Sequence, residues 1–145
     1  MIIKIKKLTD TAKIPTRGSR KAAGYDLYAD IQEPVDIVPH TTEKIPTGIA
    51  TEIPDDYFVA IFPRSGLSTK KGLNLINAIP VIDSDYRGEW LLPMHNNGLA
   101  TQTIEPGERI AQMIVLPCLE VDFEEAEELS STDRGTGGFG STGTK

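Results

Sequence analysis

Short stretches in which apolar and polar residues alternate recur along the chain. Four of them cover Ile3–Lys6, Tyr57–Phe62, Ile110–Leu116 and Leu119–Glu124, and they are rich in β-branched or aromatic residues. A period of two is typical of strands that bury one face. Because such strands follow one another at spacings of about 8 to 13 residues, the pattern predicts an all-β barrel or sandwich and not a series of βαβ units.

Glycine and proline leave little room for helices. The 13 glycines and 10 prolines interrupt the chain so often that few windows reach the roughly 10 to 12 residues of an ordinary helix. We expect at most one short helix, over Ser65–Lys71 and ended by Gly72, with a loop that contains a single turn as the alternative. Residues 77–92 predict a hairpin, in which Pro80 requires an edge position or a bulge because it donates no hydrogen bond.

The size and charge of the chain exclude several classes of protein. Its 145 residues suffice for one domain, and no apolar run approaches the roughly 20 residues of a membrane helix. A net charge of -6 has the wrong sign for a general nucleic-acid coat or an anionic membrane surface. Residues 1–7 alternate apolar and basic side chains and do not predict a secretory signal. We therefore expect a soluble cytoplasmic protein without nucleic-acid or membrane partners.

The single cysteine, Cys118, agrees with a reducing compartment. It has no second cysteine for an intrachain disulfide and no nearby histidine or cysteine with which to bind zinc. Free cysteines are among the most buried residue types. We expect Cys118 to be a small buried side chain on a strand.

A change in composition marks a boundary near Leu129. Six of the nine residues from Glu120 to Glu128 are acidic, and after Leu129 the only apolar side chain of any size is Phe139. We therefore predict a core domain over residues 1–129 and a mobile arm over residues 130–145. Composition alone favours a disordered tail. Alternatively, the glycine-rich stretch from Arg134 to Gly143 wraps a phosphate chain while Phe139 stacks on a flat ring.

Two further segments carry charged residues beside apolar strands. Asp26 follows Gly24 inside an apolar stretch, where it either satisfies turn amides or holds Mg²⁺, directly or through a coordinated water. Arg64 and Ser65 stand at the start of the expected helix, where a guanidinium, a hydroxyl and free amides make an anion site. The alternative for this segment is ordinary N-capping by Ser65 beside a solvated arginine.

The last two segments place polar side chains in a turn and inside a strand. Asp83 and Asp85 share one face of an extended chain, where carboxylates usually serve the turn itself, although one at the rim of a pocket can activate a water as a general base. Gln112 lies in the interior of a predicted strand. Its amide needs a hydrogen-bond partner, either the backbone or a ligand.

Together, five segments strongly resemble the motifs of the trimeric dUTP pyrophosphatases, or dUTPases, in the family's order. They are Ala23–Ala29 (AGYDLYA), Pro63–Ser68 (PRSGLS), Val81–Glu89 (VIDSDYRGE), Gly107–Met113 (GERIAQM) and Arg134–Gly143 (RGTGGFGSTG). The resemblance extends from Ala22 to Gly143. One departure is Pro80, where the family usually has glycine, so that the path of the hairpin is expected to differ locally.

The resemblance implies a jelly-roll-like β-barrel that assembles as a homotrimer with active sites shared between subunits. The implied reaction is the Mg²⁺-assisted hydrolysis of dUTP to dUMP and pyrophosphate, which limits uracil in DNA and supplies dUMP. Asp83 is implied as the base that activates water, and Asp26 as the residue that fixes the metal's water shell. The implied substrate-binding residues are Arg64, Ser65, Gly66, Asn77, Val81, Ile82, Tyr86, Gln112, Arg134, Phe139, Ser141 and Thr142, with the arm of another subunit closing over the ligand.

Two alternatives remain from the sequence. A dCTP deaminase shares this fold but activates water with a glutamate, whereas the hairpin here presents Asp83. A protein of this fold can also bind a regulatory partner, either instead of hydrolysis or in addition to it. Intact motifs argue against the loss of activity.

Overall fold

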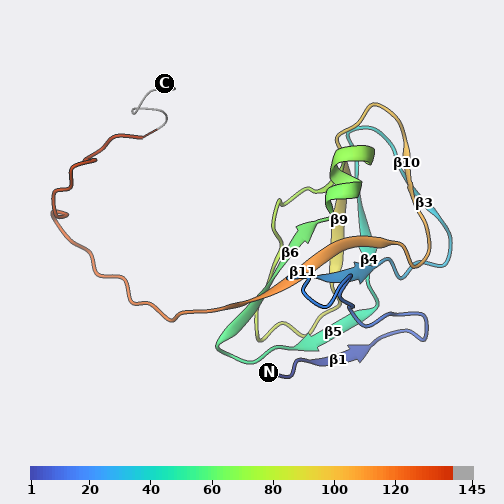
Figure 1. Cartoon of the computed structure of the whole chain (residues 1–145), viewed down its shortest axis with the longest axis horizontal. Helices are drawn as coiled ribbons and strands as arrows, with labels where there is room; N and C mark the ends of the chain where they lie inside the picture. Colours follow the sequence, from blue (N-terminus) through green and yellow to red (C-terminus); the bar gives the residue numbers. More distant parts are fainter. Residues whose placement is uncertain (139–145) are drawn as a thin grey trace.

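The structure, a computed structural model, describes residues 1–138 of the chain. In this part, eleven strands and one short helix follow one another (Figure 1). Their bounds are β1 Lys4–Lys7, β2 Tyr25–Tyr28, β3 Val35–Ile37, β4 Thr42–Pro46, β5 Ile49–Glu52, β6 Tyr57–Pro63, η1 Leu67–Lys71, β7 Leu73–Leu75, β8 Val81–Ile82, β9 Leu91–Asn96, β10 Gln102–Ile104 and β11 Arg109–Pro117.

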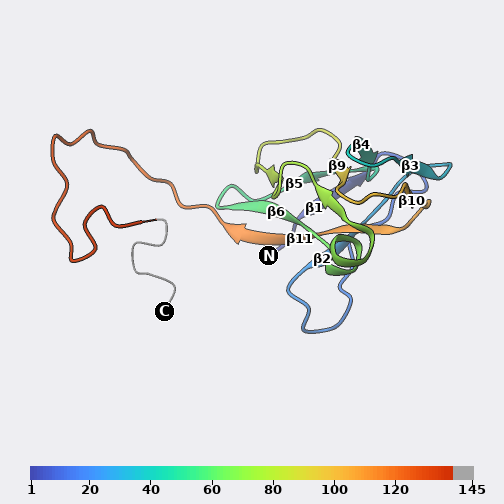
Figure 2. The ribbon, with the colours of Figure 1, turned by 90° about the horizontal axis from the view of Figure 1, so that it is seen from above.

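The strands pair in an order that differs strongly from their order along the chain. The largest sheet has four antiparallel strands in the order β2-β11-β6-β8, and a second has three in the order β4-β9-β7. Two ribbons, β1-β5 and β10-β3, complete the wall (Figure 2). This all-β arrangement confirms the predicted jelly-roll-like barrel, including three of the four strands expected from alternation.

The core lies between the two larger sheets. Its largest fully buried side chains include Trp90, Leu92, Ile61 and Ile110, which come from both sheets and from the loop before β9. Burying a large aliphatic side chain contributes about 1.5 to 3 kcal/mol. Strand β11 is central because it pairs with β6 over seven residues and with β2 on its other side. The residues that face outward from β11 are therefore held on both flanks.

The short helix forms where the sequence predicts it. Ser65 and Gly66 are helical, and the wider turn of η1 follows over Leu67–Lys71. Gly72 ends it in the left-handed conformation, with φ +67°, and its N–H donates to the carbonyl of Leu67. Glycine adopts this conformation without the penalty that a Cβ brings. Leu67 is buried and attaches the helix to the barrel.

The predicted strand over Leu119–Glu124 is wrong. β11 ends at Pro117, and the described residues after it form neither strand nor helix. Leu119, Val121 and Phe123 are 81, 62 and 96% exposed, and the chain runs away from the barrel (Figure 1). Alternation supplies a face to bury, but a strand also needs a neighbour with which to pair. Within residues 1–138, the chain offers this segment none.

The expected burial of Cys118 is wrong for the same reason. It is the first residue after β11 and its side chain is exposed. Its backbone N–H still donates to the carbonyl of Asp56 at 2.8 Å, so the chain leaves the sheet just beyond this point.

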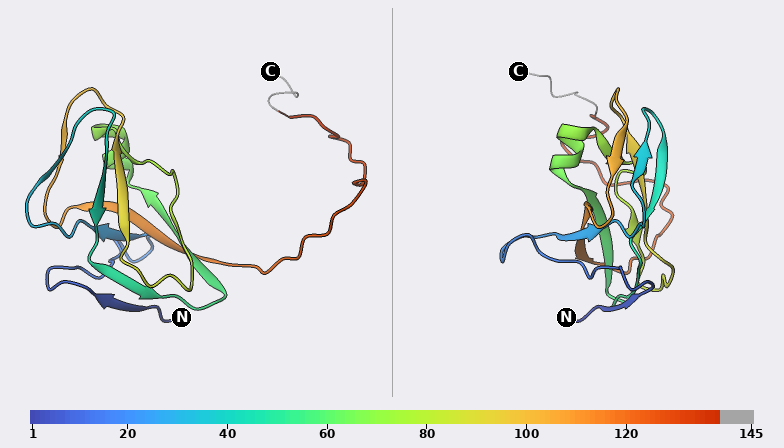
Figure 3. Two further views of the ribbon diagram at one scale, coloured as in Figure 1. Left: turned by 180° about the vertical axis from the view of Figure 1, so that it is seen from behind. Right: turned by 90° about the vertical axis from the view of Figure 1, so that its right-hand side faces the viewer.

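The views from behind and from the side show how the barrel is capped (Figure 3). The turn of η1 lies at one end, and the segment between β1 and β2 projects from the wall. Among the described residues, no helix is long and apolar enough to cross a membrane.

Candidate functional site

Residues from three of the predicted segments meet in one hollow of the barrel surface, which we name the arginine hollow. It has a volume of about 230 Å³. Strand β2, the connection from β6 to η1, strand β11 and the projecting segment before β2 all contribute to it. Its lining residues are Gly18, Ala22, Gly24, Asp26, Arg64, Ser65, Gly66, Arg109 and Gln112.

The register of the four-stranded sheet brings these residues together. On β11, Gln112 faces Asp26 of β2 on one side and Phe62 of β6 on the other. Arg64 follows directly after the end of β6. Residues opposite one another in adjacent strands place their side chains on the same face of the sheet. The pairing thus joins positions separated by more than 80 residues in sequence.

Asp26 is the electrostatic centre of the arginine hollow. Its residue is 8% exposed, and its two carboxylate oxygens accept from different arginines. Arg64 Nε lies 3.0 Å from Oδ1, and Arg109 Nη1 lies 3.1 Å from Oδ2. A carboxylate this buried requires such partners. Two cations around one anion leave a local excess of positive charge, which favours an anionic ligand.

The other polar residues of the arginine hollow use only some of their hydrogen-bonding groups within the protein. Gln112 Nε2 donates to the carbonyl of Pro63 at 3.2 Å, so the backbone alternative for this amide is present. Ser65 is exposed, and the alternative of a solvated Arg64 beside a capping Ser65 is wrong because Arg64 is paired with Asp26. Gly66 has open space around the position of a Cβ. Hydroxyl and backbone donors therefore border the hollow.

A second cavity, the hairpin hollow, lies around β8. Its volume is about 240 Å³. Asp83 is exposed and follows β8, at the start of a turn in which the N–H of Tyr86 donates to the Asp83 carbonyl at 3.2 Å. The Tyr86 hydroxyl donates to the carbonyl of Glu89 at 3.0 Å. The lining residues are Asn77, Pro80, Val81, Ile82, Asp83, Tyr86, Glu89, Trp90 and Leu91.

Pro80 immediately precedes β8, at the position where the family usually has glycine. β8 is the edge strand of its sheet, and the carbonyl of Pro80 accepts the N–H of Ile61 at 2.9 Å. An edge position is where a proline is tolerated. The preceding turn contains Ala78 with φ +61°, a conformation that residues other than glycine rarely adopt. Of the two settings predicted for Pro80, an edge position or a bulge, the structure has the edge.

The structure divides the predicted site residues into separate groups. Asp83 and Asp26 line different hollows, and the two hollows share no lining residue. Arg134 is exposed on the arm, where its Nε donates to the carbonyl of Gly137 at 2.8 Å. Phe139, Ser141 and Thr142 lie outside the described residues.

Sequence reasoning missed several residues of the hollows. Arg109 was not predicted, although it lies in the same segment as Gln112 and pairs with Asp26. Its basic side chain beside a predicted anion site was the available signal. Glu89 and Leu91 also line the hairpin hollow. Within residues 1–138, no group of three or more histidine, cysteine, aspartate or glutamate side chains could hold a metal ion.

The barrel, the positive hollow and the exposed carboxylate of the hairpin define a protein suited to bind an anionic ligand and to activate water. The chain belongs to the dUTPase family, whose model matches residues 10–143.

Known proteins support this assignment in sequence and in structure. The deoxyuridine 5'-triphosphate nucleotidohydrolase of a Hydrogenobaculum species is 45% identical over 145 residues, which cover both chains completely. A dUTPase mutant of Staphylococcus bacteriophage 80alpha, solved with dUpNHpp, has a TM-score of 0.90 at 28% identity and covers 99% of each chain. A mutant dUTPase of phage phi11 of S. aureus, described with a structural Mg(II) ion, has a TM-score of 0.80 at 25% identity, covering 88% of this chain and 98% of that one.

Proposed function

We propose that the protein hydrolyses dUTP to dUMP and pyrophosphate, as the names of its relatives indicate for them. In this reaction a water attacks the α-phosphorus, and pyrophosphate leaves. The observation that carries the proposal is the exposed carboxylate of Asp83 in the hairpin hollow, combined with the separate arginine hollow. One provides a base for the water, and the other provides charge for the phosphates.

Asp83 is the proposed general base. It lies at the end of an edge strand, and none of the ion pairs between described residues involves it. A carboxylate free of cationic partners keeps its lone pairs for a water molecule. A positioned general base contributes typically 10² to 10⁴ in rate. The neighbouring Asp85 lines neither hollow, so the structure favours Asp83 between the two.

The arginine hollow is the proposed phosphate site. Arg64, Ser65, Gly66 and Gln112 line it together, and they offer a guanidinium, a hydroxyl, backbone amides and a carboxamide. Hydrogen bonds from charged donors to phosphate are about twice as strong as those between neutral groups. Because the chain has a net charge of -6, a triphosphate can bind only where positive charge is locally in excess, as it is in this hollow.

The hairpin hollow is the proposed nucleoside site. Asn77 and the backbone of Val81 and Ile82 lie where an extended edge can present donors and acceptors to the rim of a uracil ring. Tyr86 is 44% exposed and held by its bond to Glu89, so its ring can pack beneath the deoxyribose. A ring fixed in this way leaves no room for a 2′-hydroxyl, and this selects against ribonucleotides.

Mg²⁺ fits this site as an ion carried by the phosphates. Both oxygens of Asp26 are engaged by arginines, so this carboxylate is suited to holding a coordinated water and not the ion itself. Mg²⁺ keeps several waters and takes phosphates as ligands, and when bound it neutralises phosphate charge. Asp26 and Gln112 would bind waters of its shell. A mutant dUTPase of phage phi11 is likewise described with a Mg(II) ion, there a structural one.

We propose a homotrimer because the chain belongs to the dUTPase family, and we propose sites shared between subunits because residues 1–138 of one chain do not assemble the whole site. Ile82 faces Val59 across the sheet, and the antiparallel β8 then runs away from the end of β6 at which Arg64 lies. Six residue steps of strand separate the Asp83 level from Arg64, roughly 20 Å at the usual rise. A water at the α-phosphorus must be close to both groups. The hairpin hollow of one subunit would therefore face the arginine hollow of another.

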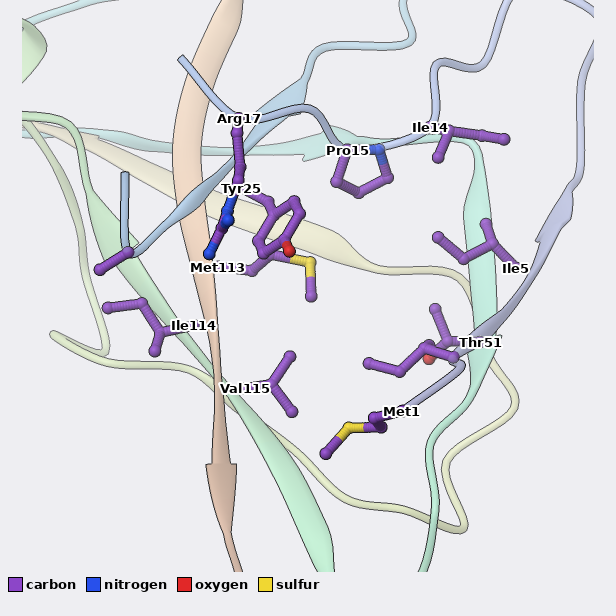
Figure 4. A pocket seen from close by; sticks show the side chains of 12 residues that line it. Met1, Ile5, Ile14, Pro15, Arg17, Tyr25, Thr51, Met113, Ile114 and Val115 are labelled. Carbon is purple, nitrogen blue, oxygen red and sulfur yellow. The ribbon is translucent and has the colours of Figure 1, made fainter. Parts of the chain in front are cut away.

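An apolar hollow of about 450 Å³ also supports assembly. Figure 4 shows Ile5 from the N-terminal strand, Tyr25 from β2 and Val115 from β11 around it. A surface of this kind is typical of contacts between subunits. The apolar side chains of Leu119, Val121 and Phe123 after β11 are also exposed, so a neighbouring subunit could cover them.

The arm over residues 130–145 is proposed to close over a neighbouring site. Its described part is almost entirely exposed and carries Arg134 outward. Arg134, Phe139, Ser141 and Thr142 would supply a charge, an aromatic stack and hydroxyl donors. Closing excludes bulk water from the reaction.

Parallel assays of four nucleotides test the proposal. Pyrophosphate release from dUTP, dCTP, dTTP and UTP is measured with and without Mg²⁺, and ammonia is measured in the dCTP reaction. We expect pyrophosphate from dUTP at a rate far above the other three, and more with Mg²⁺. Ammonia from dCTP without pyrophosphate from dUTP would instead show a deaminase.

Mixed trimers test the sharing of sites. Chains that lack the arm are mixed with Asp83→Asn chains, and the subunits are allowed to exchange. Shared sites predict recovered activity, because an intact arm and an intact Asp83 then meet around one pocket. Mixed trimers without any recovery would show that each chain closes its own site.

A further inference from the structure

One arginine of the arginine hollow has no role in the proposed reaction. Arg109 pairs with Asp26 at 3.1 Å and lines the hollow beside Gln112. Its side chain is 49% exposed, so it has not been buried simply to fill the core. The carboxylate of Asp26 is thus shared between Arg64, which is assigned to the phosphates, and Arg109, which is not.

A β-bulge places Arg109 in the hollow. Arg109 faces Tyr28 of β2 and Ala111 faces Leu27, so that Ile110 is an extra residue in the ladder. Without the bulge, Arg109 and Gln112 would point to opposite faces, because they are three residues apart. The extra residue returns both to the same face. Ile110 and Ala111 are both completely buried, as the bulge requires.

The same segment also fixes Arg64 from a second side. Arg64 Nε is bound to Asp26 Oδ1, and its Nη1 donates to the backbone carbonyl of Arg109 at 3.1 Å. Two nitrogens of the Arg64 guanidinium, Nε and Nη1, are thus bound by Asp26 and by the backbone of residue 109. Within the described residues, no protein acceptor is bound to its Nη2. That nitrogen is available to a ligand.

We propose that Arg109 is a positioning residue of the phosphate site. It holds Asp26 through Oδ2, and Asp26 in turn holds Arg64 through Oδ1, which leaves Nη2 of Arg64 for the triphosphate. A donor fixed before binding loses less freedom when the phosphate arrives. This inference rests on the proposed function of the hollow.

Binding measurements on Arg109→Gln test the proposal. The Kd of a non-hydrolysable dUTP analogue and the Kd of deoxyuridine are measured for wild type and variant by calorimetry. We expect the analogue to bind at least tenfold more weakly and deoxyuridine to change less than twofold. Arg20→Gln is the matched control, because it removes one exposed positive charge from the segment beside the hollow without touching Asp26. It should weaken the analogue less than threefold.

A double-mutant cycle with Arg64→Gln separates positioning from direct contact. If Arg109 acts through Arg64, adding Arg109→Gln to the Arg64→Gln chain weakens analogue binding less than threefold. If the two losses multiply instead, Arg109 binds phosphate on its own and the positioning role is wrong. Unchanged binding in the single variant would also overturn the proposal.

Arg109→Lys covers the case in which the glutamine variant does not fold. Lysine keeps the charge but lacks the planar fork of arginine. We expect a stable protein with analogue affinity between those of wild type and a charge-free site. Full wild-type affinity would contradict the positioning role and leave only charge. If the wild type itself neither binds nor hydrolyses dUTP, the proposed function fails, whereas the outcomes above concern Arg109 alone.

Discussion

The two hollows are nearly equal in size but are built in different ways. The arginine hollow, about 230 Å³, is held together by charged side chains from β2, β11 and the connection after β6, which sheet register brings together. The hairpin hollow, about 240 Å³, is lined mostly by one continuous stretch of chain around a turn. Function in the first therefore depends on partners far away in sequence, whereas function in the second depends on local backbone geometry.

Asp83→Asn should have the largest effect and leave both hollows intact. The amide has nearly the same shape and still binds water, but it accepts no proton. We expect kcat to fall by at least about 10², the lower end for loss of a general base, with little change in thermal stability or analogue affinity. Asp85→Asn is the matched control and should keep wild-type kcat. An Asp83→Asn enzyme with most of its turnover would make this residue a turn carboxylate only.

Removing the residues from Arg134 onward tests whether the two hollows suffice for catalysis without the arm. The described part of this segment is mostly exposed, so thermal stability should hardly change. We expect kcat/KM for dUTP to fall by roughly 10², because several charge-assisted contacts of about 1.5 to 3 kcal/mol each are lost. Supplying the arm as a separate peptide should not rescue activity, since tethering provides the effective concentration. Unchanged kcat/KM would show that the hollows act without the arm.

Gly24→Ala should damage only the arginine hollow. A Cβ at this position would lie 2.7 Å from Gln112 Oε1 and 3.3 Å from Gln112 Cβ, so the glutamine must move. We expect analogue affinity to fall about tenfold, because displacing a binding group by 1 Å can cost up to about 100-fold. The matched change in the other hollow is Gly88→Ala, whose Cβ would collide with the Tyr86 ring. The Gly88→Ala variant should change the preference for dUTP over UTP more than it changes affinity for the analogue. If Gly88→Ala mainly weakened analogue binding and Gly24→Ala mainly changed the preference, the assignment of phosphates and nucleoside to separate hollows would be wrong.

Tyr86→Ala should have the smallest effect on dUTP itself. Removing the ring opens space for a 2′-hydroxyl, so the preference for dUTP over UTP in kcat/KM should fall about tenfold. Tyr86→Phe keeps the ring but loses the hydrogen bond to Glu89, and it should retain most of the preference. If the alanine variant kept the preference for dUTP over UTP, another group of the pocket would be responsible for sugar selection.

Local patterns predicted much of the fold but not its pairing. The strands at Tyr57–Pro63 and Arg109–Pro117 and the turn ended by Gly72 follow from alternation and from glycine chemistry. Leu119–Glu124 shows the same alternation, yet it forms no strand in the described chain. Whether an alternating segment becomes a strand depends on a neighbour, and neighbours are set by tertiary structure.

The candidate site shows the same limit at single residues. Asp83, Arg64 and Gln112 stood out because polar side chains interrupt apolar stretches. Arg109 did not stand out, because the bulge at Ile110 decides to which face of the sheet its side chain points. The sequence does not reveal this bulge, since two adjacent apolar residues also occur in regular strands. The division into two hollows depends on the antiparallel direction of β8, which no single segment reveals.

The exposure of Cys118 has a practical consequence for laboratory work. The chain contains one cysteine, and it stands where the last strand ends and the exposed segment begins. A maleimide fluorophore therefore reacts at one site of the unaltered protein and reports on movement of the segment beyond it. The same thiol can link two molecules by a disulfide in an oxidising buffer. Purified samples stored without a reductant are expected to accumulate covalent dimers, visible on a non-reducing gel.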